Sequence, residues 1–116
     1  MYALFIVLND TDYLDEVLAR FMKIGVGGAT IIESQGMARA IVHNNYESIP
    51  LFGSLKSMLS DSRPYSKTIF TVLNSQEMVN KTVAEIQELL SDVVRTDIGF
   101  IFTMPVAQVF PIKKSN

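Results

Sequence analysis

The stretch from Gly25 to Arg39 contains the residue pattern that points most directly to binding chemistry. Gly25 is placed to end a helix, a short apolar strand follows, and Gly36 marks the exit of that strand into a long polar segment. Arg39 then lies at the strand exit, where a guanidinium group can donate paired hydrogen bonds to a phosphate or a carboxylate. The alternative reading of Arg39, on this pattern alone, is a solvated cation at a strand end.

The chain has few of the residue types that catalytic or metal-binding sites require. The chain has no cysteine, which excludes a thiol nucleophile, a disulfide and a thiolate metal site. His43 is the single histidine, so metal binding there would need several copies gathered by symmetry. Asp10, Asp12, Asp15 and Glu16 fit negative charge at the start of a helix. No H-E-x-x-H or phosphate-loop motif occurs. We predict a protein that is not an enzyme and has no metal site.

The length, composition and net charge of the chain limit which kinds of protein it can be. A chain of 116 residues with 48% hydrophobic residues is most simply one domain over residues 1–116, with apolar surface left for subunit contacts. A net charge of -2 gives no basic footprint for nucleic acid. No apolar run reaches membrane-spanning length, and no signal-peptide pattern opens the chain. The sequence therefore predicts a cytoplasmic protein without nucleic-acid binding or membrane insertion.

Two types of hydrophobic period predict the elements that must position Arg39. Short apolar runs of strand length cover residues 2–8, 29–34, 68–73 and 100–104. Apolar residues at helical spacing follow the first and third runs, and Asn74 with Glu77 resembles a capping box for the second helix. The order strand, helix, strand, strand, helix, strand predicts an α+β, ferredoxin-like fold. Its antiparallel sheet carries both helices on one face.

Two segments lie outside that core pattern. Residues 37–67 form a long excursion between the second and third strands, with a short helix predicted over residues 49–59. Connections of this length are usually functional, so a partner-binding arm and a docked helical lid both remain open. Near the other end of the chain, Gln108–Ile112 is predicted as a short edge strand after Pro105.

The predicted sheet has one face without helices. That face keeps every second side chain of four apolar strands, and monomers rarely expose such a patch. We therefore expect the bare face to close on other copies of the chain.

The Gly25–Arg39 stretch also resembles the PII-type signal-transduction proteins, the nitrogen regulatory P-II family. The family pattern is G-x-x-G-x-T-x-x-E-x-x-G-x-G-R-Q. The positions that match it are Gly25, Gly28, Thr30, Glu33, Gly36 and Arg39. Ala38 and Ala40 depart from it. The resemblance implies a homotrimer whose sheets face a common centre, and a T-loop that contacts a regulatory partner protein. The tyrosine signature for covalent modification is missing, and Tyr46 does not replace it.

The resemblance further implies an adenine nucleotide site in the cleft between subunits. The residues at matching positions are Gly36, Met37, Ala38 and Arg39 at the strand exit, Thr96 and Gly99 before the last strand, and Lys113 near the end. The lysine of the family loop before the last strand is absent, and Pro111 and Lys113 stand where two arginines would. Lys67 or Arg63 are further candidate cations. Ala40 lacks the amide that the family uses near 2-oxoglutarate, which argues against sensing of that metabolite.

The first hypothesis is a PII-like trimeric regulator. It binds a small anionic ligand, such as an adenine nucleotide, between subunits and signals through residues 37–67. The alternative is a structural or metal-tolerance-type trimer with the same fold and no nucleotide site. A small ferredoxin-like enzyme is disfavoured by the missing catalytic residues. The sequence does not identify the partner or the ligand.

Overall fold

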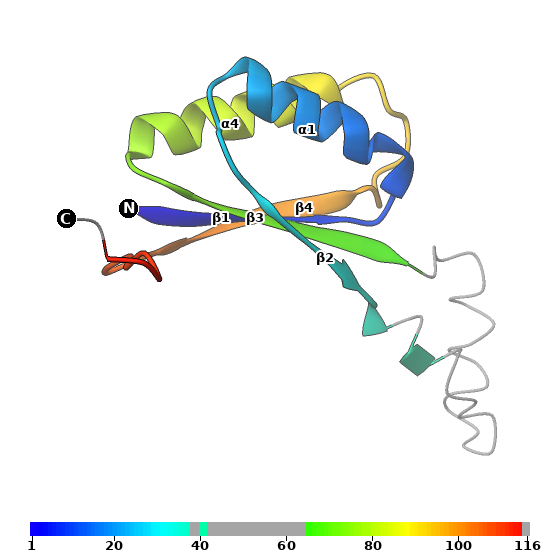
Figure 1. The fold of residues 1–116 in the computed structure, drawn as a ribbon. Helices are drawn as coiled ribbons and strands as arrows, with labels where there is room; N and C mark the ends of the chain where they lie inside the picture. The colour runs from blue at the N-terminus through cyan, green and yellow to red at the C-terminus, as the bar shows by residue number, and fades with distance from the viewer. Residues whose placement is uncertain (38–39, 42–64, 115–116) are drawn as a thin grey trace.

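The computed structural model describes residues 1–37, 40–41 and 65–114. These residues form two layers, a sheet and a pair of helices that both lie on one of its faces (Figure 1). The strands are β1 (Tyr2–Leu8), β2 (Thr30–Ser34), β3 (Ser66–Leu73) and β4 (Gly99–Pro105). The helices are α1 (Leu14–Lys23), preceded by the 3-10 turn η1 (Thr11–Tyr13), and α4 (Gln76–Leu89).

The strand order β2-β3-β1-β4 is that of the ferredoxin-like fold. All three strand pairs are antiparallel, and β1 lies between β3 and β4. The register puts Phe5 opposite both Phe70 and Phe102, and Leu8 opposite both Lys67 and Gly99. The predicted α+β fold with two helices on one face is therefore confirmed.

The core lies between the sheet and the helices because alternate strand residues point to the helix side. Leu4, Ile6 and Leu8 of β1 are almost completely buried there, together with Ile69 of β3. The helices contribute one stripe each, which includes Val17 and Phe21 of α1 and Val79 and Ile86 of α4. This is the packing that the helical and strand periods predict.

The helix ends follow local backbone chemistry. The Asp10 carboxylate accepts a hydrogen bond from the Asp12 amide and so caps η1. Gly25 has φ +88, the left-handed conformation that ends α1 as predicted. At α4 the predicted cap is wrong by one residue: the Ser75 hydroxyl, and not the Asn74 side chain, accepts a hydrogen bond from the Met78 amide at 3.1 Å. Ser75 is the extended residue directly before the helix, and a hydroxyl at that position can reach the amide three residues on.

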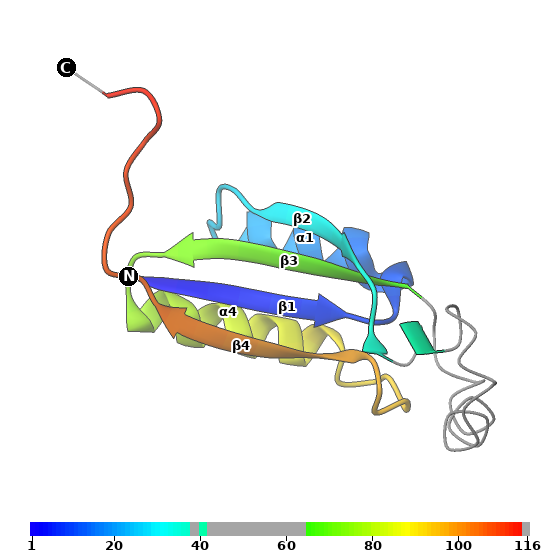
Figure 2. The same ribbon diagram turned by 90° about the horizontal axis from the view of Figure 1, so that it is seen from below.

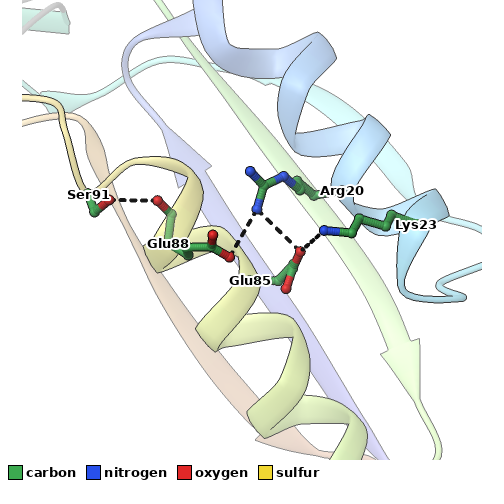
Figure 3. A network of polar contacts seen from close by, with 5 residues as sticks. All are labelled: Arg20, Lys23, Glu85, Glu88 and Ser91. Carbon is green, nitrogen blue, oxygen red and sulfur yellow. Dashed lines mark hydrogen bonds and ion pairs between the residues drawn. The ribbon is translucent and has the colours of Figure 1, made fainter.

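An ion-pair network joins the outer sides of the two helices (Figure 3). Arg20 of α1 contacts Glu85 at 3.2 Å and Glu88 at 3.3 Å, and Lys23 contacts Glu85 at 3.1 Å. The hydrogen bond from Lys23, with the nearby Arg20 charge, lowers the pKa of the Glu85 carboxyl. The network bridges α1 and α4 beside the apolar core that both helices share with the sheet.

The segment after β4 differs from its prediction. Residues 106–111 have no regular secondary structure, so the edge strand expected at Gln108–Ile112 is not formed in the single chain. The Val106 amide donates to the Met1 carbonyl at 3.0 Å, and the segment then leads away from the sheet (Figure 2). We call residues 106–114 the tail. The helix predicted over 49–59 lies outside the described residues.

Within the described ranges, no helix combines the length and the apolar character needed to cross a membrane.

Gly99 is required where β4 meets β1. Its φ is +153, and a Cβ atom there would lie 2.0 Å from the Val7 carbonyl oxygen. Gly99→Ala should therefore separate β4 from β1 and lower the free energy of unfolding by roughly 2–4 kcal/mol. Urea unfolding at matched protein concentration measures this loss. Gly27→Ala is the matched control, since a Cβ at Gly27 meets no atom within 4 Å. Equal stability of the two variants would contradict the assigned packing.

Candidate functional site

The candidate residues at one end of the sheet belong to two separate elements. Thr96 and Gly99 lie in the loop before β4 and at its first residue, whereas Gly36 and Met37 lie just after β2. All four are exposed. Ala38 and Arg39, which follow directly, lie outside the described residues, as does Arg63.

The loop before β4 is held by the turn that follows β1. The Asn9 and Asp10 amides both donate to the Ile98 carbonyl, at 2.7 and 3.3 Å. The Asn9 side-chain amide adds a bond to the Asp97 carbonyl at 3.2 Å. Two carbonyls of the loop are thus fixed by neighbouring residues of one turn, which sets the position of Thr96 and Gly99.

Arg95 brings a positive charge to this loop, but the charge is paired with the neighbouring Asp97. Its guanidinium donates two hydrogen bonds to the Asp97 carboxylate, at 3.1 and 2.9 Å. The hydrogen bonds to Asp97, with the negative charges of Asp97 and Asp10 nearby, raise the pKa of Arg95. A bidentate pair of this kind is directional and leaves little net charge for a bound anion.

Thr96 and Gly99 also border a hollow of about 540 Å³ between α4 and β4. We call it the α4–β4 groove. Its floor and walls are mostly apolar side chains from three elements, including Leu8, Val83, Ile86 and Ile101. None of the described residues that line it is charged. Its size falls within the range of small-molecule pockets, ~300–1,000 Å³, and its lining suits apolar groups.

The exit of β2, unlike the apolar α4–β4 groove, has a pair of charged side chains and an exposed turn. Lys67 of β3 donates a hydrogen bond to the Glu33 carboxylate across the strand pair. Beyond Ser34 the chain enters a helical turn, in which the Ala40 amide donates to the Gly36 carbonyl at 3.1 Å. Met37 in this turn is 78% exposed. Lys67, a candidate cation in the sequence, is therefore engaged by Glu33.

A single chain does not bring these groups together. Gly99, Leu8, Lys67 and Glu33 are successive cross-strand partners, so three strand spacings, roughly 14 Å, separate the start of β4 from the end of β2. Lys113 is farther still, because the tail leaves the sheet at Pro105, the opposite end of β4 (Figure 2). One copy thus holds the candidate residues at three separate places.

The helix-free face of the sheet is the second surface of interest. A row of aromatic rings crosses it: Phe5 lies 5.7 Å from Phe70 and 4.7 Å from Phe102, between ring centroids. Phe102 in turn lies 6.0 Å from Phe100. By strand alternation, no described strand residue on this face is charged.

Hydroxyl groups occupy the part of this face near the exit of β2. The Ser34 and Ser66 hydroxyls lie 2.7 Å apart, and the Thr68 hydroxyl donates to Ser34 at 2.9 Å. These groups satisfy one another within the sheet, so they can be covered without leaving unpaired polar atoms.

Metal binding gains no support in the described part of the chain. No group of three or more histidine, cysteine, aspartate or glutamate side chains is arranged there to hold an ion. His43 lies outside the described residues.

The residues that shape the loop before β4 could not be identified from the sequence. Asn9 and Asp10 have the local pattern of a strand stop and a helix start, whereas their partners are about ninety positions away in the chain. Arg95 and Asp97 carry a local signal, since opposite charges two positions apart can pair across a tight turn.

Comparison with known families gives one clear result. The family model described as "Nitrogen regulatory protein P-II" matches residues 1–116 of this chain. No curated protein sequence matches it.

The Glu33–Lys67 pair makes a testable contribution at the β2 exit. The hydrogen bond from Lys67, with its positive charge, lowers the pKa of the Glu33 carboxyl below the ordinary value of 4.5. The pairing therefore stabilises the β2–β3 pair above about pH 4.5 and is lost as the pH falls through the lowered pKa. A carbon-detected NMR titration of Glu33 should give a midpoint below 4.5, and Lys67→Met should raise it. An unchanged midpoint in that variant would show that the two side chains do not pair in solution.

Proposed function

This chain belongs to the nitrogen regulatory protein P-II family, a family of regulatory signalling proteins, and we propose that it acts as a trimer with a ligand site between its subunits. The ligand is a small anion, for which an adenine nucleotide is the first candidate. Residues 37–67 carry the signal to a partner protein. A cytoplasmic location remains part of this proposal.

The helix-free face of the sheet is the observation that carries the assembly. Its apolar members remain substantially exposed in the single chain: Phe100 is 58% exposed, Met104 51% and Val72 43%. Burial of apolar surface contributes ~25 cal/mol per Å², and no described charge on the face opposes it. A face of this composition closes most simply on copies of itself around a symmetry axis.

The candidate residues lie at the two opposite edges of the sheet, which supports a ligand site between two copies of the chain. The exit of β2 and the start of β4 are on opposite edges of the sheet. In a closed ring, the β2 edge of one copy faces the β4 edge of the next. Gly36 and Arg39 of one subunit can then share a cleft with Thr96 and Gly99 of its neighbour.

The charges that are available favour a ligand of modest charge. Arg95 is paired with Asp97, and Lys67 is paired with Glu33. That leaves Arg39, Lys113 and Arg63, of which Arg39 and Arg63 lie outside the described residues, as the cations proposed to meet the ligand. Because a triphosphate needs several cations or a nest of amides, this short set of cations suits a monophosphate, a diphosphate or a cyclic nucleotide better.

The exit of β2 offers a route from the ligand to a partner. The helical turn at Gly36 and Ala40 starts directly after the strand and leads into residues 42–64. A ligand that contacts Arg39 would therefore bias the segment that follows it. We propose this segment as the surface that the partner reads.

The assembly can be tested by placing a charge on the helix-free face. The chain has a mass of 13.0 kDa, so light scattering should give about 39 kDa for the native protein. Phe102→Asp should yield a particle of 13.0 kDa, because its carboxylate would be buried without a partner at the interface. Val72→Asp is a second variant on the same face, in case Phe102→Asp does not fold.

Met22→Asp is the matched control for both variants. Met22 is 80% exposed on α1, on the helix side of the sheet, so this variant should keep the native mass. A native protein of monomer mass at micromolar concentration would overturn the proposed trimer.

The ligand site can be tested with a thermal-shift panel of adenine nucleotides, cyclic dinucleotides, 2-oxoglutarate and divalent metals. A ligand at a hundred times its dissociation constant should stabilise the protein by about 2.7 kcal/mol. Arg39→Ala should abolish the shift with a nucleotide, whereas Lys81→Ala, an exposed cation on α4, should retain it. A response to metals alone would favour the alternative of a trimer without a nucleotide site.

A further inference from the structure

The ion pair of Arg95 with Asp97 lies in the loop that contributes to the proposed ligand cleft. The guanidinium donates from Nε to Oδ1 at 3.1 Å and from Nη2 to Oδ2 at 2.9 Å. Thr96, a candidate ligand residue, stands between the two paired residues in the chain. Both side chains remain accessible to solvent, Arg95 at 40% and Asp97 at 60% of their surface. A ligand that contacts Thr96 therefore approaches this pair.

The loop keeps its position through main-chain groups rather than through this pair. The Ile98 carbonyl accepts hydrogen bonds from the amides of Asn9 and Asp10, and the Asp97 carbonyl accepts one from the Asn9 side chain. Loss of the Asp97 carboxylate would leave these main-chain bonds in place. An exposed ion pair also contributes little to stability. The main effect of the pair is therefore on the charge that the loop presents to a ligand.

The Asp97 carboxylate limits what the Arg95 guanidinium can bind. An open guanidinium binds a phosphate through two parallel hydrogen bonds, and Asp97 already occupies the Nε–Nη2 edge in this way. The hydrogen bonds to Asp97, with its negative charge and that of Asp10, raise the pKa of Arg95. The guanidinium thus stays positive while its charge is balanced, and the exposed carboxylate repels further phosphates on a ligand.

The opposite wall of the proposed cleft has the same arrangement of charge. At the exit of β2, Lys67 donates a hydrogen bond to the Glu33 carboxylate across the strand pair. Each wall thus brings a described cation together with its own counter-ion. Lys67 and Glu33 are held in register by the sheet, whereas the pair at Asp97 lies in a loop beside a candidate ligand residue. Asp97 is therefore the counter-ion better placed to act on a ligand.

We propose that Asp97 is a specificity-determining residue of the ligand site. By occupying the Nε–Nη2 edge of Arg95, it selects a nucleotide with few phosphates, such as a nucleoside monophosphate, over the triphosphate. A longer phosphate chain would have to lie beside the carboxylate or displace it from the guanidinium, and either costs binding free energy. This inference rests on the proposed ligand site between subunits.

Calorimetric titration of the full chain with AMP, ADP and ATP tests the role of Asp97. EDTA keeps divalent metal ions from masking the phosphate charges, and the ionic strength is held constant because salt screens them. The native protein should bind AMP at least as tightly as ATP. Asp97→Asn, which keeps the size of the side chain, should tighten ATP binding by about tenfold or more, since one nearby charge shifts ionic equilibria by that amount. AMP binding should change by no more than about threefold, because fewer charges lie near the loop.

Asp92→Asn is the matched control. Asp92 is an exposed carboxylate in the turn that follows α4, so this variant changes the net charge equally without releasing Arg95. It should keep the native order of affinities. Arg95→Met combined with Asp97→Asn shows whether the released guanidinium binds the added phosphates, and the gain for ATP should disappear in this double variant. Asp97→Ser releases Arg95 in a second way, in case Asp97→Asn does not fold.

The outcomes separate this inference from the proposed ligand site. Nucleotide binding with the same ratio of ATP to AMP affinity in the native protein and in both Asp97 variants overturns the role of Asp97 and leaves the site standing. A native protein that prefers ATP to AMP overturns that role as well, and so does a gain for ATP that persists without Arg95. Failure of every nucleotide to bind the native protein and its variants overturns both proposals.

Discussion

The antiparallel register of β1 between β3 and β4 is the constraint on which the rest of the structure depends. Because side chains alternate along a strand, this register sends Leu4, Ile6 and Leu8 to the helices and Phe5 to the other face. A shift of one residue would exchange the two sets. Glycine at position 99 permits β4 to pair with β1 in this register, because a Cβ atom there would lie 2.0 Å from the Val7 carbonyl oxygen. The pairing of β1 with β3 and β4 thus determines the core, the helix-free face and the position of the loop before β4.

Most of the fold could be predicted from the sequence because its signals are local. The period of two in residues 2–8 and the helical stripe that includes Val17 and Phe21 each depend on neighbouring positions. The cap of α4 was missed by one residue, because Asn74 and Ser75 are both good caps and the strand exit decides between them. The excursion at 37–67 has no comparable period, and the helix predicted at 49–59 stays a prediction.

The candidate site was less predictable because its parts meet through long-range contacts. The pattern from Gly25 to Arg39 is local and indicated the family, which the match over residues 1–116 confirms. The hydrogen bond from the Asn9 side chain to the Asp97 carbonyl joins distant parts of the chain, so no local sequence pattern predicts it. The sequence also could not show that Lys67 is engaged by Glu33, because that pair depends on the β2–β3 register.

The proposed ligand site requires a second subunit. Within one chain, the exit of β2, the start of β4 and the tail lie at three separate places, and no rotation of a side chain can cover those distances. Rotational symmetry joins opposite edges of the sheet without any change of fold. The strand predicted at Gln108–Ile112 is not formed in the single chain, although the segment is apolar and exposed there. An apolar period reports that a segment will be buried, and it does not report which copy of the chain will bury it.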